Sequence, residues 1–365
     1  DGKAPAKGND PEARRPASTA HYERTCSSRE SGGISMMSSR AVAPKLFALS
    51  IAVIACAALG LAFGAVALSP ATVGYALAHP SQTDLAGVVV WDIRLPRVLI
   101  GACVGAGLGV AGAMLQMLFR NPLVDPYISG VSAGAALAAS IGFTIGVSFA
   151  AIPALAFGGG LACAFVVAVV GARDGAAGNL RLVLAGVAMS ALCAAAVTLL
   201  LLRSGETGGL SVLGWLAGGI GGRGWTELAW IVGYLSVGFA GSVFVVHELN
   251  ALRLGATAAG GLGLNVDASR WRILSIASLI TAACVAVSGV VGFVGLMVPH
   301  AMRRLVGGDA RRLLPASAVG GAGAVIFADT LARTLAPPSE IPLGVLLAFA
   351  GVPFFLAIAR KPVDV

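Results

Sequence analysis

Residues 97–119 read RVLIGACVGAGLGVAGAMLQMLF, an apolar stretch with one charged residue at its start and glycines at positions 101, 105, 107 and 109. A helix needs about 20 apolar residues to cross the hydrocarbon core of a bilayer, and this stretch is long enough. Small residues on one helix allow the backbone of a second helix to approach closely. No predicted strand precedes the glycines, so they are not expected to form a nucleotide-binding turn. The stretch therefore predicts a membrane-spanning helix with close neighbours.

The composition of the whole chain agrees with this prediction. Of the 365 residues, 57% are hydrophobic and 12% are charged, and the mean hydropathy is +0.87. Soluble domains contain about 25% charged residues, which argues against both a cytosolic enzyme and a disordered chain. The isoelectric point near 9.6 comes without a basic stripe interleaved with aromatic residues, so nucleic acid is not an expected partner. The fold class predicted is an all-α, polytopic membrane protein.

Apolar runs bounded by proline, glycine or charge predict about ten transmembrane helices in all. They are 46–68, 97–119, 127–146, 149–171, 180–202, 228–247, 271–288, 290–306, 313–334 and 342–360. An even number of spans puts both ends of the chain on one side. That side then holds every lysine and arginine except Arg94, Arg97, Arg203, Arg223 and Arg333, so the positive-inside rule predicts an N-in, C-in topology. Residues 1–45 are predicted to be a disordered or non-native tail, and residues 46–365 a ten-helix domain.

The predicted spans contain few groups that could drive transport or chemistry. Between the ends of the spans the exceptions are Asp329 and Glu340, both at the outer end of the ninth span, so an ion-coupled secondary carrier is a remote alternative. A phosphate-binding loop needs a lysine after a glycine-rich turn, and no lysine of this chain has that context. The cysteines and histidines are scattered, which predicts neither a metal site nor a bound cofactor. The chain is predicted not to be an enzyme, and energy for transport is expected from a separate ATPase.

Several ordered motifs extend from the second predicted span to the end of the chain. They are WDIRLPR (91–97), RNPLVDP (120–126), the glycines and leucines of 254–263, VGFVGLMVPH (291–300), GDARRLLP (308–315), ADTLAR (328–333), EIPLG (340–344) and GVPFF (351–355). In order and spacing they resemble the FecCD-like permease subunits of bacterial type II ABC importers, which import iron-siderophores, haem and vitamin B12. The resemblance implies a type II ABC importer permease fold in the bacterial inner membrane. It also implies a homodimer, two cytoplasmic ATPase subunits and a periplasmic substrate-binding protein as partners.

Three external arginines are implied to dock the binding protein. Arg94 and Arg97 lie three residues apart at the start of the second span, and Arg333 ends the ADTLAR motif. In the resembling family, arginines of these two motifs pair with acidic residues of the binding protein. Guanidinium groups form directional pairs with carboxylates and steer association. The alternative is that these arginines extend from helix ends into the interface without a partner.

Two cytoplasmic sites are also implied by the resemblance. Asn121 and Leu123 follow the second span and belong to a cytoplasmic gate in the family, although a plain helix stop before Pro122 is an alternative. The loop of about residues 248–270 is long enough for short helices of its own. Within it the residues expected to couple to the ATPase, through tight crossing of short helices and apolar knobs, are Leu254, Gly255, Ala259, Leu262 and Gly263. A flexible glycine linker is the alternative for this loop.

The predicted pathway bears on the class of transported ligand. Walls without charge suit a large, preformed chelate, which fits haem, vitamin B12 and ferric siderophores alike, and within the resembling family haem is the ligand we favour. The side chains of Met114, Met117, Tyr127 and His300 suit either contact with an iron porphyrin or packing between helices. A small oxyanion such as molybdate would favour a more polar lining and is the outlier.

Overall fold

The computed structural model describes residues 1–2, 43–64, 68–80, 84–171, 178–337 and 339–359. Residues 1–39 and 40–365 form two units, and the helices below belong to the second. The predicted N-terminal tail lies outside the described residues, apart from its two first positions and the start of helix α2 at Ala43.

Among the described residues, seven helical segments are long and apolar enough to cross a membrane. They contain α2 (Ala43–Ala62), α5 (Leu95–Phe119), α7 (Ile152–Gly171), α8 (Gly178–Arg203), α10 (Trp225–Phe244), α13 (Val266–Ser288) and α15 (Ala310–Ala332). The segment of α5 begins earlier, at Leu85, because α4 (Leu85–Val88) and a π-helical turn (Val89–Arg94) run into it. The prediction of an all-helical, multi-pass membrane protein is confirmed for the described residues.

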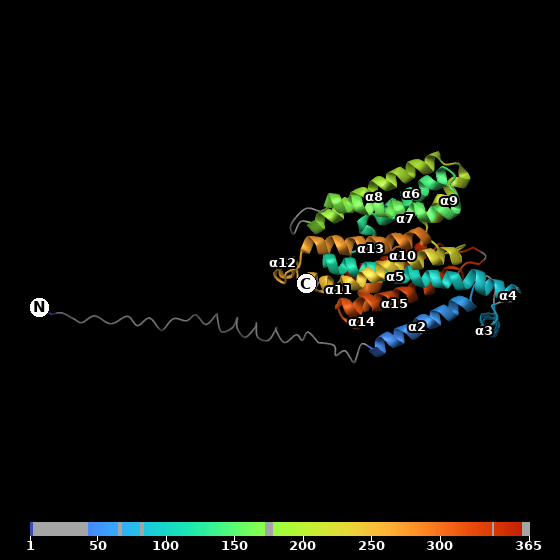
Figure 1. The fold of residues 1–365 in the computed structure, drawn as a ribbon, viewed down its shortest axis with the longest axis horizontal. Helices are drawn as coiled ribbons and strands as arrows, with labels where there is room; N and C mark the ends of the chain where they lie inside the picture. Colours follow the sequence, from blue (N-terminus) through green and yellow to red (C-terminus); the bar gives the residue numbers. More distant parts are fainter. Residues whose placement is uncertain (3–42, 65–67, 81–83, 172–177, 338, 360–365) are drawn as a thin grey trace. The chain divides into compact units, whose positions relative to one another are not determined.

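The other three predicted spans coincide with shorter helices, namely α6 (Val131–Thr144), α14 (Val294–Val306) and α16 (Leu343–Ala359). Each predicted span therefore overlaps a described α-helix, and α6, α14 and α16 are shorter than the runs that predicted them. Short helices α3 (Pro70–Ala78) and α9 (Glu206–Leu216) lie with α4 at one end of the bundle (Figure 1). Helices α11 (Val246–Arg253) and α12 (Ala256–Gly261) lie at the opposite end.

Helix α5 occupies the middle of the bundle (Figure 1). It packs against α15, α13, α14 and α10, while α2 packs on α15 at one side and α6, α7 and α8 form a group at the other. A Cβ atom at Gly105 would overlap the carbonyl group of Gly321, and one at Gly109 would overlap that of Ser317. The glycine spacing of α5 was expected to give close helix crossings, and the contact with α15 confirms this expectation.

Local sequence accounts for where several of these helices begin and end. The Asn265 side chain accepts a hydrogen bond from the backbone N–H of Ala268 at 3.0 Å and caps the start of α13. Asp309 accepts one from the N–H of Arg311 at 2.9 Å and caps α15. Helix α13 ends at Gly289, where φ is +66°, a conformation that glycine adopts without strain. The chain then remains non-helical until α14 begins at Val294.

Candidate functional site

An ion-pair network closes the end of the bundle where α5 begins. The guanidinium of Arg97 donates to both carboxylate oxygens of Asp329, from Nε at 3.1 and 3.0 Å and from Nη2 at 2.9 Å. The same guanidinium donates to Glu340 at 3.0 and 2.9 Å. Arg97 is buried, as is Asp329, whereas the Glu340 side chain is 47% exposed. Hydrogen bonds from Arg97 hold the pKa of the Glu340 carboxyl below its ordinary value.

The two other predicted docking arginines lie beside this network. Arg333 is buried, donates to the carbonyl of Gly60 at 2.7 Å and has its Nε 3.3 Å from Asp329. Arg94 is also buried and donates to the carbonyls of Leu61 and Ala62 at 2.6 and 2.8 Å. The structure therefore brings the three arginines together at one end of the bundle, as predicted. It does not leave them exposed as the prediction required, because helix ends and carboxylates of the same chain cover them.

A polar cavity of about 410 Å³ opens beside the network. Arg97, Asp329 and Glu340 line one part of it, and Arg223 and Trp215 line another. Arg223 precedes α10, and burial lowers its pKa although Glu227 opposes this effect. The cavity places charges of both signs at this end of the bundle.

The predicted gate residues lie in the turn that follows α5. Arg120 ends the helix with φ +51°, and the side-chain oxygen of Asn121 accepts the N–H of Leu123 at 2.9 Å. Asn121 is exposed, Leu123 is half-buried and the following Val124 is buried. These contacts form a turn stabilised by the asparagine side chain, which is the geometry of a helix stop. The gating role of Asn121 and Leu123 stays a prediction.

The predicted coupling loop contains two short helices, α11 and α12, as its length suggested. Leu254 and Leu262 are 67% and 66% exposed and lie on either side of α12, whereas Ala259 is fully buried. Gly255 has φ +111° and Gly263 has φ +83°. The space beside Gly263 is open within the described chain, and the tight helix crossing expected of these glycines stays a prediction. At both positions glycine is favoured because other residues adopt these backbone conformations only with strain.

The turn after α5 lies beside the coupling loop. A Cβ atom at Gly255 would lie 3.3 Å from Nη1 of Arg120, which ends α5. Gln116 reaches the same turn from inside the bundle, because its amide donates to the carbonyl of Val124 at 3.4 Å, and it also donates to the carbonyls of Gly295 and Leu296 of α14 at 3.3 and 3.1 Å. The predicted gate and the predicted coupling loop are therefore neighbours in this chain.

Sequence analysis missed a second polar centre, which holds the break between α13 and α14. The hydroxyl of Tyr127 donates to the carbonyl of Val291 at 2.7 Å and accepts its N–H at 3.0 Å. Asp125 accepts the backbone N–H groups of Tyr127 and Phe293, and Phe293 has φ +68°. Asp125 lies in the connection between two predicted spans, so the expectation of few charges within the spans is not affected by it. The available signal was the Asp-Pro pair at 125–126, because aspartate commonly caps such turns.

Three of the four residues considered for haem contact instead hold helices together. Met114 and Met117 are buried in α5, and the Tyr127 hydroxyl is bonded to the Val291 backbone. His300 lies edge-on to Phe354 with ring centroids 6.1 Å apart. The packing alternative is thus the observed one for both methionines and for Tyr127.

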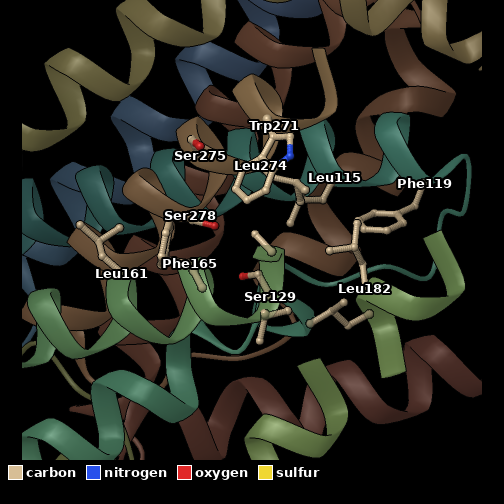
Figure 2. Close-up of a pocket in the computed structure, with 14 residues that line it drawn as sticks. Leu115, Phe119, Ser129, Leu161, Phe165, Leu182, Trp271, Leu274, Ser275 and Ser278 are labelled. Atoms are coloured by element: carbon tan, nitrogen blue, oxygen red, sulfur yellow. The ribbon is translucent and has the colours of Figure 1, made fainter. Parts of the chain in front are cut away.

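The interior of the bundle holds an apolar cavity of about 250 Å³ between α5, α7, α8 and α13. Figure 2 shows Leu182, Leu274 and Phe119 around it, with Ser129 and Ser278 among the few polar groups. Pockets for drug-sized ligands measure about 300–1,000 Å³, so this cavity is too small for a large chelate. This cavity is therefore not the pathway for such a ligand.

A bundle of apolar spans with a polar network at one end and short exposed helices at the other defines a membrane-embedded transporter subunit. The pattern of the FecCD transport family matches residues 51–361, and the chain belongs to this family. It is therefore the permease subunit of an ABC transporter and not an enzyme, since the ATPase of such transporters is a separate subunit.

Curated relatives and solved structures agree with this assignment. The chain is 41% identical over 278 residues to the cobalamin import system permease protein BtuC of Halobacterium salinarum, covering 76% of this chain and 74% of that protein. It is 39% identical over 305 residues to the hemin transport system permease protein HmuU of Yersinia pestis, covering 81% and 90%. A metal-chelate type ABC transporter solved in an inward-facing conformation has a TM-score of 0.76 and 32% identity, covering 87% of this chain and all of that one.

Proposed function

We propose that this chain is the permease of a type II ABC importer that moves a large iron chelate, with haem as the favoured ligand, across the bacterial inner membrane. All ten helices that match predicted spans cross the bilayer in this proposal, with both termini in the cytoplasm. Vitamin B12 and ferric siderophores are the alternative ligands. The observation that supports the proposal best is the uncharged outer surface of α8 and α16.

Neither α16 nor α8 between Arg181 and Arg203 contains an acidic or basic residue. Large apolar side chains on these helices face outward, including Leu192 at 65% exposure and Phe349 at 77%. In a homodimer, such surfaces would form a wall along which a preformed chelate slides without fixed coordination. A bare metal ion would need convergent ligands, and among the described residues no three His, Cys, Asp or Glu side chains are grouped to supply them.

The relatives support the importer class and leave haem as our choice of ligand. The hemin permease of Yersinia pestis aligns over 90% of its own length at 39% identity, and the cobalamin permease of Halobacterium salinarum over 74% at 41% identity. Reconstitution tests the choice directly. Proteoliposomes containing the permease, its ATPase and its binding protein should accumulate haem when ATP is enclosed, and they should not accumulate cyanocobalamin or a ferric hydroxamate. Accumulation of cobalamin alone would overturn haem as ligand and leave the importer assignment intact. Accumulation that persists without the ATPase would overturn the importer.

We propose a homodimer, and relatives suggest what would contradict it. The Fe(3+) dicitrate system of Escherichia coli has two permease proteins, FecC and FecD, which match this chain at 34% and 38% identity. Co-expression with any neighbouring permease gene, followed by mass measurement of the purified complex, tests the composition. Two copies of this chain with two ATPases are expected. A stable complex with one copy each of two permeases would refute the homodimer.

We propose that Leu254 and Leu262 insert into an apolar groove of the ATPase, with Gly255 and Gly263 shaping the loop and Ala259 anchoring it. Exposure of two leucines beside a short helix supports this role, since exposed apolar groups at the cytoplasmic end need a partner. Leu254→Asp should abolish capture of the ATPase by the purified permease. Leu305→Asp, at an exposed leucine outside the loop, is the matched control and should retain capture. Equal capture by both variants would refute the coupling role.

We also propose that Arg94, Arg97 and Arg333 dock the binding protein. Because the three arginines are buried, the binding protein has to displace a group of this chain to reach them. An incoming carboxylate has to compete with Glu340, the exposed acid of the network, for the guanidinium of Arg97. Glu340→Gln should therefore speed association with the binding protein, most strongly at low salt. Surface plasmon resonance at two salt concentrations measures this rate. A rate that is unchanged or lower would leave the arginines as internal structure only.

A further inference from the structure

A groove of about 620 Å³ opens sideways between α10 and α15, both of which pack on α5. Val110 of α5 lies at its floor, Phe239 and Val243 line one wall, and Leu314 and Ala318 line the other. Val243 is 69% exposed, although its neighbours in the groove are apolar. Because α10 and α15 are membrane-spanning candidates, the medium that meets this opening is the bilayer.

The mouth of the groove is basic. Arg311 and His247 line it, and both are exposed. The Arg311 side chain forms no salt bridge within the described residues, and the nearby Asp309 carboxylate is bonded to Asn250 at 2.9 Å and to the backbone N–H of Arg311. The carboxylate of Glu248, which follows His247, is occupied by Arg272 at 3.0 Å. An anion at the mouth would therefore meet a guanidinium that interacts electrostatically with Asp309 but forms no salt bridge within the described residues.

We propose that this groove binds one anionic phospholipid, with an acyl chain between α10 and α15 and the phosphate at Arg311 and His247. From Arg311 to Ala318 the helix rises about 10 Å, a depth that takes up a substantial part of an acyl chain. Basic pockets between transmembrane helices at the membrane surface are suited to acidic lipid headgroups. Within the described residues α8 packs mainly on α6 and α7, so this part of the proposed pathway is apart from the groove, whereas α16, the other helix of the proposed pathway, packs on α15.

Charge and shape of the groove are tested separately. Native mass spectrometry of the full chain in detergent, with phosphatidylglycerol or phosphatidylcholine added at equal concentration, measures the fraction of protein carrying one lipid. Phosphatidylglycerol should be retained and phosphatidylcholine should not. Arg311→Gln should weaken retention of phosphatidylglycerol about fivefold, as expected for loss of one cation near a headgroup. Arg304→Gln is the control, because Arg304 is exposed outside the groove and should leave retention unchanged.

Ala318→Leu fills the groove without altering charge and should also lower retention of phosphatidylglycerol. The thermal unfolding midpoint of each variant in detergent shows whether it is folded. If Ala318→Leu does not fold, the loss of lipid retention in Arg311→Gln still tests the site. Soluble glycerol phosphate should not compete, which distinguishes a lipid from a free phosphate ester. Equal losses in Arg304→Gln and Arg311→Gln would reduce the effect to general surface charge and overturn the site. Equal binding of both lipids, or full retention in a folded Ala318→Leu variant, would overturn it as well.

Discussion

Replacing Asp329 by alanine tests whether the outer network stabilises the bundle. Asp329 is 2% exposed and accepts three hydrogen bonds from Arg97, and Arg333 lies 3.3 Å away. Removing one partner of a buried ion pair costs about 3–5 kcal/mol, because the remaining charge is left buried without its counter-charge. Arg97 keeps Glu340 and Arg333 keeps the carbonyl of Gly60, which places the expected cost near the lower limit, about 3 kcal/mol. For a chain of this size the midpoint of thermal unfolding should fall by roughly 5 °C.

Thermal unfolding in one detergent, followed by circular dichroism, measures this fall. Glu340→Gln is the matched control, since it removes the other carboxylate of the same network. The Glu340 side chain is 47% exposed, so its pair with Arg97 should contribute less than about 1 kcal/mol. The reasoning from burial predicts a much larger fall for Asp329→Ala than for Glu340→Gln. Equal falls, or no fall for Asp329→Ala, would show that burial of this network does not determine its contribution.

Three further changes probe the turn, the network and the helix break. Gly255→Ala should cost about 1–3 kcal/mol of stability, because φ +111° and ψ 155° suit glycine alone. The control Gly260→Ala, inside α12, should cost nothing. Equal thermal unfolding midpoints for the two variants would contradict this reasoning. The pKa of Glu340 is lowered in the folded chain, so its contribution is fully present above the ordinary glutamate pKa of about 4.3 and is lost as pH falls through the lower folded value. The unfolding midpoint should therefore fall less below about pH 4 in Glu340→Gln than in the natural chain. Tyr127→Phe leaves the Val291 backbone without its partner and should cost about 1–3 kcal/mol; an unchanged midpoint and unchanged amide exchange at Val291 would show that the hydroxyl does not hold the break.

Helix positions were largely predictable because apolar runs in this chain are interrupted by proline, glycine or charge. The glycines of α5 also predicted its close contact with α15. The start of α14 was predicted four residues early, at 290, because the segment from Gly289 to Phe293 is as apolar as the helix that follows it. Its break depends on left-handed backbone at Gly289 and Phe293 and on hydrogen bonds to Tyr127. A hydropathy pattern contains no information about those bonds.

The burial of the arginines was not predictable from local sequence. Arg97 and its partners Asp329 and Glu340 are separated by 232 and 243 residues. From local sequence we placed all three groups at the same end of the bundle. We expected the arginine to be exposed, and we did not expect the two acids to pair with it. Opposite charges at one membrane depth lower the free-energy cost of burying each other. The prediction of an arginine and two acids at the same depth was therefore the sequence signal that could have indicated their burial. Leu254 and Leu262 are exposed, as expected for apolar side chains that insert into a partner. Their proposed contacts lie on another protein, so the sequence of this chain does not contain them.

Helix α5 connects the two ends at which partners are proposed. Arg97 near its start belongs to the outer network, and Arg120 at its end lies against Gly255 of the coupling loop. Between these ends the backbone of Gly105 meets that of Gly321 on α15 without side chains between them. Rotation or sliding of α5 alone would break this contact and expose backbone surfaces, since close-packed interiors do not deform continuously. We therefore expect a displacement at the coupling loop to move α5 and α15 together, and because Asp329 is on α15, the outer network would move with them as one unit.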